Sequence, residues 1–275
     1  GGLAGFNPQN LANTVWAYAT AGVAADALYA AVAEAAMSGG LAGFTPQNLA
    51  NTVWAYATAG VAADALYAAV AEAAVGGGLA GFTPQNLANT VWAYATADHY
   101  HQALLAYCSR VISDSLARDP SRWSIKSRHQ LHQWQLWLFL EHAADAQQHL
   151  LSESERRLCC DAMHDTRVRV SALQRSVSAA LAAIRFGFEE EYVEPRTSYS
   201  LDLALPSSRI AIEVDGPFHF LLPDGRGVRK SNGPTLLKRR LLAAAGWRVI
   251  SVPFYEWDGF ATANERQTYL QGLLC

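Results

Sequence analysis

The feature that most constrains this chain is a repeat of 38 residues. Phe6, Phe44 and Phe82 recur at that spacing, and residues 1–38 differ from residues 39–76 at three positions only. A fixed period in this range is typical of stacked supersecondary units, each of which buries its apolar face against its neighbours. The repeat therefore favours an extended array over a single closed core.

Each unit is predicted to hold two helices. In the second unit, Thr45 suits an N-cap and Pro46 suits the first helical position, where the missing N–H costs nothing. Apolar residues then recur at helical spacing until Gly60, and an alanine-rich second helix is expected over residues 62–74. We therefore predict an α-solenoid of 38-residue αα-hairpin repeats over residues 1–97.

The polar side of the first helix in each unit carries two asparagines and a threonine. A column of amides on successive hairpins would hydrogen-bond successive bases of RNA, one per unit. The alternative is a solvated face with local helix capping. The residues concerned are Asn10, Asn13, Thr14, Asn48, Asn51, Thr52, Asn86, Asn89 and Thr90.

Charge is divided unevenly along the chain. Residues 1–97 contain four acids and neither Lys nor Arg, so all 21 basic residues follow them. Attraction to a polyanion must then come from the second part of the chain. No apolar run reaches the roughly 18–20 residues of a membrane span. The four cysteines form no disulfide framework, which favours a reducing compartment.

Residues 98–167 are expected to complete the third unit and to add degenerate, capping helical repeats and a linker helix. Neither the histidines of this segment nor Cys159-Cys160 has the spacing of zinc ligands, so we expect no metal site there. The chain begins at Gly1 inside the repeat and without Met. We interpret it as a fragment that lacks any targeting segment.

The repeated segment Phe-Thr-Pro-Gln-Asn-Leu-Ala-Asn-Thr-Val-Trp-Ala-Tyr-Ala, with its period of 38, resembles the octotricopeptide repeat proteins of green algal organelles. The resemblance covers residues 1–97. It implies binding of organellar transcripts, in the chloroplast stroma or the mitochondrial matrix. These units contain no basic residues, so few phosphate contacts are expected from them.

The second part of the chain changes to alternating strands. A hairpin that pairs Leu205 with Ile210 puts Asp202 opposite Glu213, and Asp215 joins the same face of the sheet. Opposed carboxylates repel each other. Such a pair implies a bound cation, a raised pKa or exposure to solvent.

Four motifs in order resemble the RAP domain, which is itself similar to restriction-endonuclease-like folds. They are Leu201-Asp-Leu-Ala-Leu, Ile210-Ala-Ile-Glu-Val-Asp-Gly-Pro-Phe-His-Phe, Leu236-Leu-Lys-Arg-Arg-Leu-Leu and Gly246-Trp-Arg-Val-Ile-Ser-Val-Pro-Phe-Tyr-Glu-Trp. The resemblance covers about 201–260 and implies an α/β domain over 168–275, in the order helix, three strands, helix, strand, helix. Octotricopeptide arrays followed by this domain are a recurrent pairing in organellar RNA factors.

Two chemistries are open for this domain. A nuclease of this fold would hold Mg²⁺ between Asp202 and Glu213, with His219 as a proton shuttle. Asp215 occupies the position of the usual lysine, for which Lys238 is the possible substitute. For RNA binding, cations next to Phe218 and His219 suit a single strand. The residues of this predicted RNA-binding cluster are Arg226, Arg229, Lys230, Lys238, Arg239, Arg240, Arg248 and His219.

We therefore predict a single-stranded RNA-binding protein of organellar RNA processing, stability or translation. It would be non-catalytic and without a cofactor, and its partners would be organellar RNA and other RNA-processing proteins. A Mg²⁺-dependent endoribonuclease that uses Asp202, Glu213 and Asp215 is one alternative. A helical-repeat scaffold for protein interaction is the other.

Overall fold

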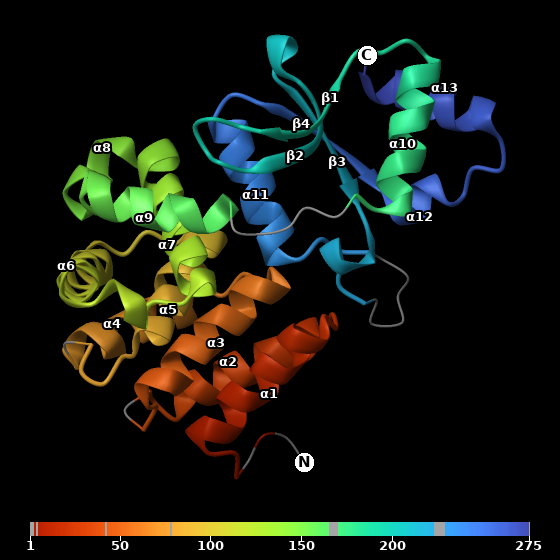
Figure 1. Cartoon of the computed structure of the whole chain (residues 1–275). Helices are drawn as coiled ribbons and strands as arrows, with labels where there is room; N and C mark the ends of the chain where they lie inside the picture. Colours follow the sequence, from red (N-terminus) through yellow and green to blue (C-terminus); the bar gives the residue numbers. More distant parts are fainter. Residues whose placement is uncertain are drawn as a thin grey trace. The chain divides into compact units, whose positions relative to one another are not determined.

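The computed structural model describes residues 3, 5–41, 43–77, 79–164, 170–222 and 229–274, which form two compact units. The helical unit comprises Gly1–Asp165 with Phe220–Leu237, and the sheet unit comprises Thr166–His219 with Lys238–Cys275. The described residues are mostly helical, with one four-stranded sheet (Figure 1). None of the described helices combines the length and apolar character that crossing a membrane requires.

The helical unit begins with paired helices of similar length. They are α1 (Pro8–Ala21), α2 (Asp26–Ser38), α3 (Pro46–Ala59), α4 (Asp64–Gly76), α5 (Pro84–Ala97) and α6 (Gln102–Arg118). They are followed by η1 (Pro120–Arg122), α7 (Ile125–Glu141), α8 (Ala143–Ala146), η2 (Gln147–His149) and α9 (Glu153–His164). The predicted helix ends are confirmed in α3: the Thr45 side chain accepts from the N–H of Asn48, and Gly60 ends the helix with a φ of 59°.

The first helices of the pairs pack in sequence, α1 against α3, α3 against α5 and α5 against α7. Buried tyrosines tie each pair to the next. The hydroxyl of Tyr56 donates to the carbonyl of Tyr29 at 2.6 Å, and Tyr94 makes the same bond to Tyr67. Because the donor lies on one pair and the acceptor on the preceding pair, these bonds fix the spacing between neighbouring pairs.

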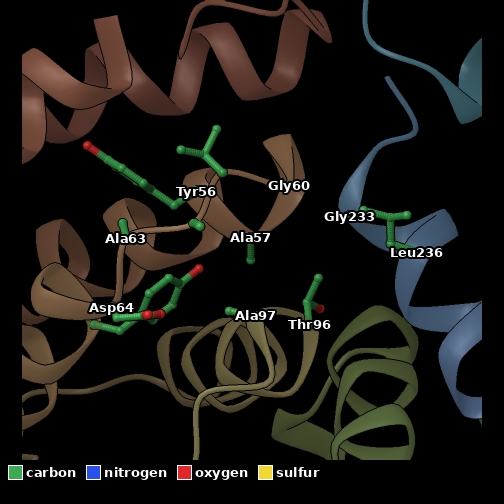
Figure 2. Close-up of a pocket in the computed structure, with 12 residues that line it drawn as sticks. Tyr56, Ala57, Gly60, Ala63, Asp64, Thr96, Ala97, Gly233 and Leu236 are labelled. Atoms are coloured by element: carbon green, nitrogen blue, oxygen red, sulfur yellow. The ribbon is translucent and has the colours of Figure 1, made fainter. Parts of the chain in front are cut away.

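Residues 220–222 and 229–237 pack with the helices, although the sequence predicted a continuous C-terminal domain over 168–275. The N–H of Leu222 donates to the carbonyl of Gly22 at 2.6 Å. Gly233 lies against α3 so closely that a Cβ there would be 1.8 Å from the carbonyl oxygen of Ala57. Figure 2 shows Gly233 and Leu236 beside a pocket of about 180 Å³ that is also lined by the ends of α3 and α5.

The elements of the sheet unit follow the predicted order, with three short helices added, η3, η4 and α12. They are α10 (Ala172–Ala183), β1 (Glu189–Val193), β2 (Ser200–Leu205), η3 (Pro206–Ser208), β3 (Ile210–Asp215), η4 (Pro217–His219), α11 (Gly233–Ala244), β4 (Arg248–Pro253), α12 (Phe254–Trp257) and α13 (Ala263–Leu274). The unit boundary falls within α11, after Leu237. The strand order is β1-β2-β3-β4, with β1 and β2, and β2 and β3, antiparallel and β3 and β4 parallel.

The two faces of the sheet carry different residues. The hairpin register pairs Leu205 with Ile210, as predicted. Leu203, Ile212 and Val214 form one core with buried residues of α10, α12 and α13. The second half of α11 crosses the opposite face (Figure 1). On that second face, Glu213 and Asp215 therefore lie between the sheet and a helix.

Candidate nucleic-acid interface

The predicted acidic face of the sheet is buried rather than solvated. Glu213 is 3% exposed and Asp215 is 1% exposed, because α11 covers both. The register of β2 and β3 runs from Leu205 and Ile210 toward Asp202 and Glu213, and Asp202 accepts a hydrogen bond from the N–H of Val214 at 2.7 Å. Exposure to solvent, one of the three predicted outcomes for the opposed carboxylates, is therefore wrong for Glu213.

Two cations from α11 neutralise the buried acids. Lys238 contacts Glu213 and also donates to the carbonyl of Ser200 at 2.8 Å. Arg239 donates to Asp215 at 2.5 Å. Lys238 and Arg239 were predicted to contact RNA, and in the structure both side chains pair with acids of their own unit, so that contact stays a prediction.

Burial dominates the pKa of the two opposed carboxyls. It raises the pKa of Glu213 to about 7, against the opposing effect of Lys238, and it also raises the pKa of Asp202. The second oxygen of Glu213 is buried and has no hydrogen-bond partner among the described residues. A raised pKa was one of the three predicted consequences of opposed carboxylates, and the burial of Glu213 favours it.

The end of β3 presents two exposed rings. His219, on η4, has its Nδ1 3.1 Å from Asp215, and its side chain is 42% exposed. Ser251 donates to the other oxygen of Asp215 at 2.5 Å, so this buried carboxylate orients the histidine. Phe218 is 94% exposed, whereas Phe220 is buried. A fully exposed phenylalanine is uncommon in a folded domain and offers a flat apolar face to a ligand.

The remaining predicted cations belong to different units. Arg248 donates to the carbonyl of Leu273 at 2.9 Å, near the C-terminal end of α13. Lys230 pairs with Asp26 at 3.5 Å within the helical unit. Arg226 lies outside the described residues.

Two predicted cations keep partial access to solvent. Arg229 is exposed and belongs to the helical unit, and Arg240 is half-buried and belongs to the sheet unit. The predicted cluster is thus divided between two units.

The amide column is largely closed. Asn48 and Asn86 are buried, and each accepts a hydrogen bond from the N–H of its own N-cap threonine at 3.1 Å. Thr52 and Thr90 are 1% exposed. Because neighbouring helices cover these side chains, they do not fit the predicted base contacts, and Asn48 and Asn86 make the local capping bonds of the alternative.

Other members of the amide column differ in exposure. Asn10 and Asn13 are exposed, Thr14 and Asn51 are half-buried, and Asn89 is buried. Asn89 accepts from the amide of Gln130 on α7 at 3.0 Å. The same sequence therefore presents an open surface at one end of the array and a closed one at the other.

Sequence reasoning missed one cluster in the helical unit. Among the described residues, Asp98, Glu141 and His142 form the one His and acid group whose ligand atoms lie within 4.8 Å of each other. The sequence signal for this cluster was Asp98, which adopts the left-handed backbone conformation that glycine adopts at the ends of α1 and α3. Its carboxylate accepts from the indole of Trp137 at 2.8 Å, so it anchors α7 to α5.

Comparison with known proteins identifies the C-terminal segment. Residues 212–273 match the family model of the RAP domain. The chain is also similar to a RAP domain-containing protein, chloroplastic, of Oryza sativa subsp. japonica, at 33% identity over 104 residues. The alignment covers 38% of this chain and 15% of the relative, so the chain spans a small part of that protein. The predicted RAP domain is confirmed, and the resemblance to octotricopeptide repeats stays a prediction.

Proposed function

We propose that this protein binds single-stranded RNA in an organelle and acts in RNA processing, stability or translation without catalysis. The observation that carries the proposal is the pair Phe218 and His219, which lies inside the RAP-matched segment. An exposed ring next to an imidazole oriented by Asp215 suits the stacking of unpaired bases. The chloroplastic relative supports an organellar location.

The rest of the chain fits this function in a less specific way. We propose that the helix pairs continue as an α-solenoid of 38-residue hairpins that lies along the RNA. The helices of residues 1–97 contain no basic side chain, so the phosphate contacts come from later residues. Arg229 and Arg240, which keep partial access to solvent, are candidates for these contacts.

Fluorescence anisotropy with end-labelled oligouridylate tests the proposal. Wild type should bind at low salt and release the RNA as salt rises. Phe218→Ala should weaken binding about tenfold, since base stacking on an aromatic ring is worth about 1–3 kcal/mol. Val193→Ala is the matched control, because Val193 is an exposed apolar residue of the same unit. If wild type retains no RNA at low salt, the scaffold function replaces this one.

A second candidate, endoribonuclease, is favoured by one contact. Lys238 reaches Glu213 from α11, where a nuclease would need a lysine beside its acids. Lys238 and Arg239 already pair with one oxygen each of Glu213 and Asp215, so Mg²⁺ would have to compete with two cations of the chain for these acids. Labelled RNA that stays intact in both Mg²⁺ and EDTA excludes the nuclease, and cleavage lost in Asp202→Asn supports it.

A further inference from the structure

One tryptophan occurs at the same position of α1, α3 and α5, in three different environments. The three helices have identical sequences. Trp16 is 44% exposed, Trp54 is half-buried and Trp92 is 4% exposed. Since the sequence is the same, the neighbours of each helix decide whether its indole is part of the core or part of the surface.

On α5 the indole is closed by α7. The indole N–H of Trp92 donates to the side chain of Gln133 at 2.7 Å, and Gln130 donates to Asn89 at 3.0 Å. Gln130 and Gln133 lie one turn apart on the same face of α7. On α5, the asparagine and the indole therefore pair with two glutamines, one of which donates a hydrogen bond and one of which accepts one.

On α1 and α3 the equivalent side chains stay open. We call Asn13, Trp16, Asn51 and Trp54 the indole stripe. No hydrogen bond connects their side chains to a described residue, in contrast to Asn89 and Trp92. The indole stripe therefore has the same hydrogen-bonding groups as Asn89 and Trp92 on α5, and these groups remain accessible to a ligand.

A cation reaches the open stripe from another helix. Lys126, exposed near the start of α7, has its Nζ 5.8 Å from the centre of the Trp54 ring. Lys126 lies on the same face of α7 as Gln130 and Gln133. It pairs with no acid among the described residues. A positive charge beside an accessible indole supplies the phosphate contact that residues 1–97 lack.

We propose that the indole stripe and Lys126 form a second RNA-binding surface, on the helical unit, in which Trp16 and Trp54 stack unpaired bases and Lys126 contacts phosphate. The proposal rests on the proposed function and adds the surface through which the helices take part. Nucleobase edges carry the adjacent donor and acceptor that Asn51 and the Trp54 indole can pair. The positive charge of Lys126 favours a polyanion over an uncharged polar ligand.

The test is the affinity of the double variant Trp16→Leu and Trp54→Leu for end-labelled oligouridylate, measured by anisotropy. We expect a loss of about tenfold or more, because stacking on each ring contributes to binding. Lys126→Gln should lower the slope of log affinity against log salt by about 0.7, as expected when one phosphate contact to a single strand is lost. Phe139→Leu is the matched control, because Phe139 is an equally accessible aromatic residue of α7 outside the stripe.

The outcomes separate this proposal from the proposed function. If wild type binds and the double variant binds equally well, the stripe is not an RNA surface, and the RNA contacts lie in the sheet unit. If the control variant loses as much affinity as the double variant, the effect is not specific to the stripe and the inference fails. If wild type binds no RNA at low salt, the proposed function itself fails.

Discussion

The helices α1 and α5 have the same fourteen residues and bury different ones. In α1, Asn10, Asn13 and Trp16 face solvent, whereas their counterparts in α5 are all buried. The helix α5 packs between α3 and α7, whereas α1 packs against α3 alone among the first helices of the pairs. Identical local sequence thus produces core on one helix and surface on the other.

The comparison shows where binding chemistry can arise in a repetitive chain. Duplication gives every repeat the same hydrogen-bonding side chains. In some copies a neighbouring helix forms hydrogen bonds with them, and in other copies they remain accessible. Asn89 and Trp92 are satisfied by glutamines of α7. The open copies on α1 and α3 have equal capacity and no such partner, which makes them sites for a ligand rather than for the fold.

The largest expected difference between the two helices is in the stability of tryptophan variants. Trp92→Ala removes a buried ring and its hydrogen bond to Gln133, so it should lower the free energy of unfolding by about 3–5 kcal/mol. Trp16→Ala should cost less than about 1 kcal/mol, because the ring is already 44% exposed. Urea denaturation of both variants measures the difference. Equal losses would mean that the two indoles have the same environment.

The second prediction contrasts the neutral groups buried in the repeats with the ionisable groups under α11. Glu213 has its pKa raised from 4.5 to about 7 by burial, with Asp202, Asp215 and Lys238 around it. A raised pKa makes the folded state favour the proton. Its contribution is therefore complete below about pH 4.5 and is lost as pH rises through about 7.

This contribution should amount to on the order of 2–3 kcal/mol across that range. Glu213→Gln should flatten the dependence of unfolding free energy on pH between 5 and 8. Glu265→Gln is the control, because the pKa of Glu265 is lowered and its effect lies at more acidic pH. A slope that is unchanged in Glu213→Gln would show that another group takes up the proton.

The smallest effect concerns the capping asparagines. Asn10 and Asn48 accept the same hydrogen bond from the N–H of the preceding N-cap, both at 3.1 Å. Asn10→Ala should cost about 0.5–1 kcal/mol, because water can replace the lost acceptor. Asn48→Ala should cost about 1–3 kcal/mol, because it leaves a part-buried N–H unpaired. Thermal unfolding of both variants decides whether burial or capping alone sets the cost.

The sequence predicted the elements of this fold well because their signals are local. The N-cap Thr45, the terminating Gly60 and the hairpin between Leu205 and Ile210 each act within a few residues of the chain. The RAP domain was predicted from motifs that lie in order along one segment, and the match over residues 212–273 confirms the domain.

The candidate sites were harder to predict because they depend on what covers a face. Lys238 and Arg239 looked like an exposed basic run, and only the docking of α11 on the sheet turns them toward Glu213 and Asp215. Repetition hid the indole stripe in the same way. No property of the local sequence distinguishes Trp54 from Trp92, since the difference arises from α7, which lies more than thirty residues further along the chain.

Photo-crosslinking of halogenated oligouridylate to the whole chain, followed by cleavage before aspartate, shows whether the accessible indoles of α1 and α3 contact RNA. Asp26, Asp64 and Asp98 are the first three aspartates, so cleavage places Trp16, Trp54 and Trp92 in three separate peptides. We expect crosslinks in the peptides that contain Trp16 and Trp54 and none in the peptide that contains Trp92. Equal crosslinking of all three, or crosslinking of the Trp92 peptide alone, would contradict this expectation.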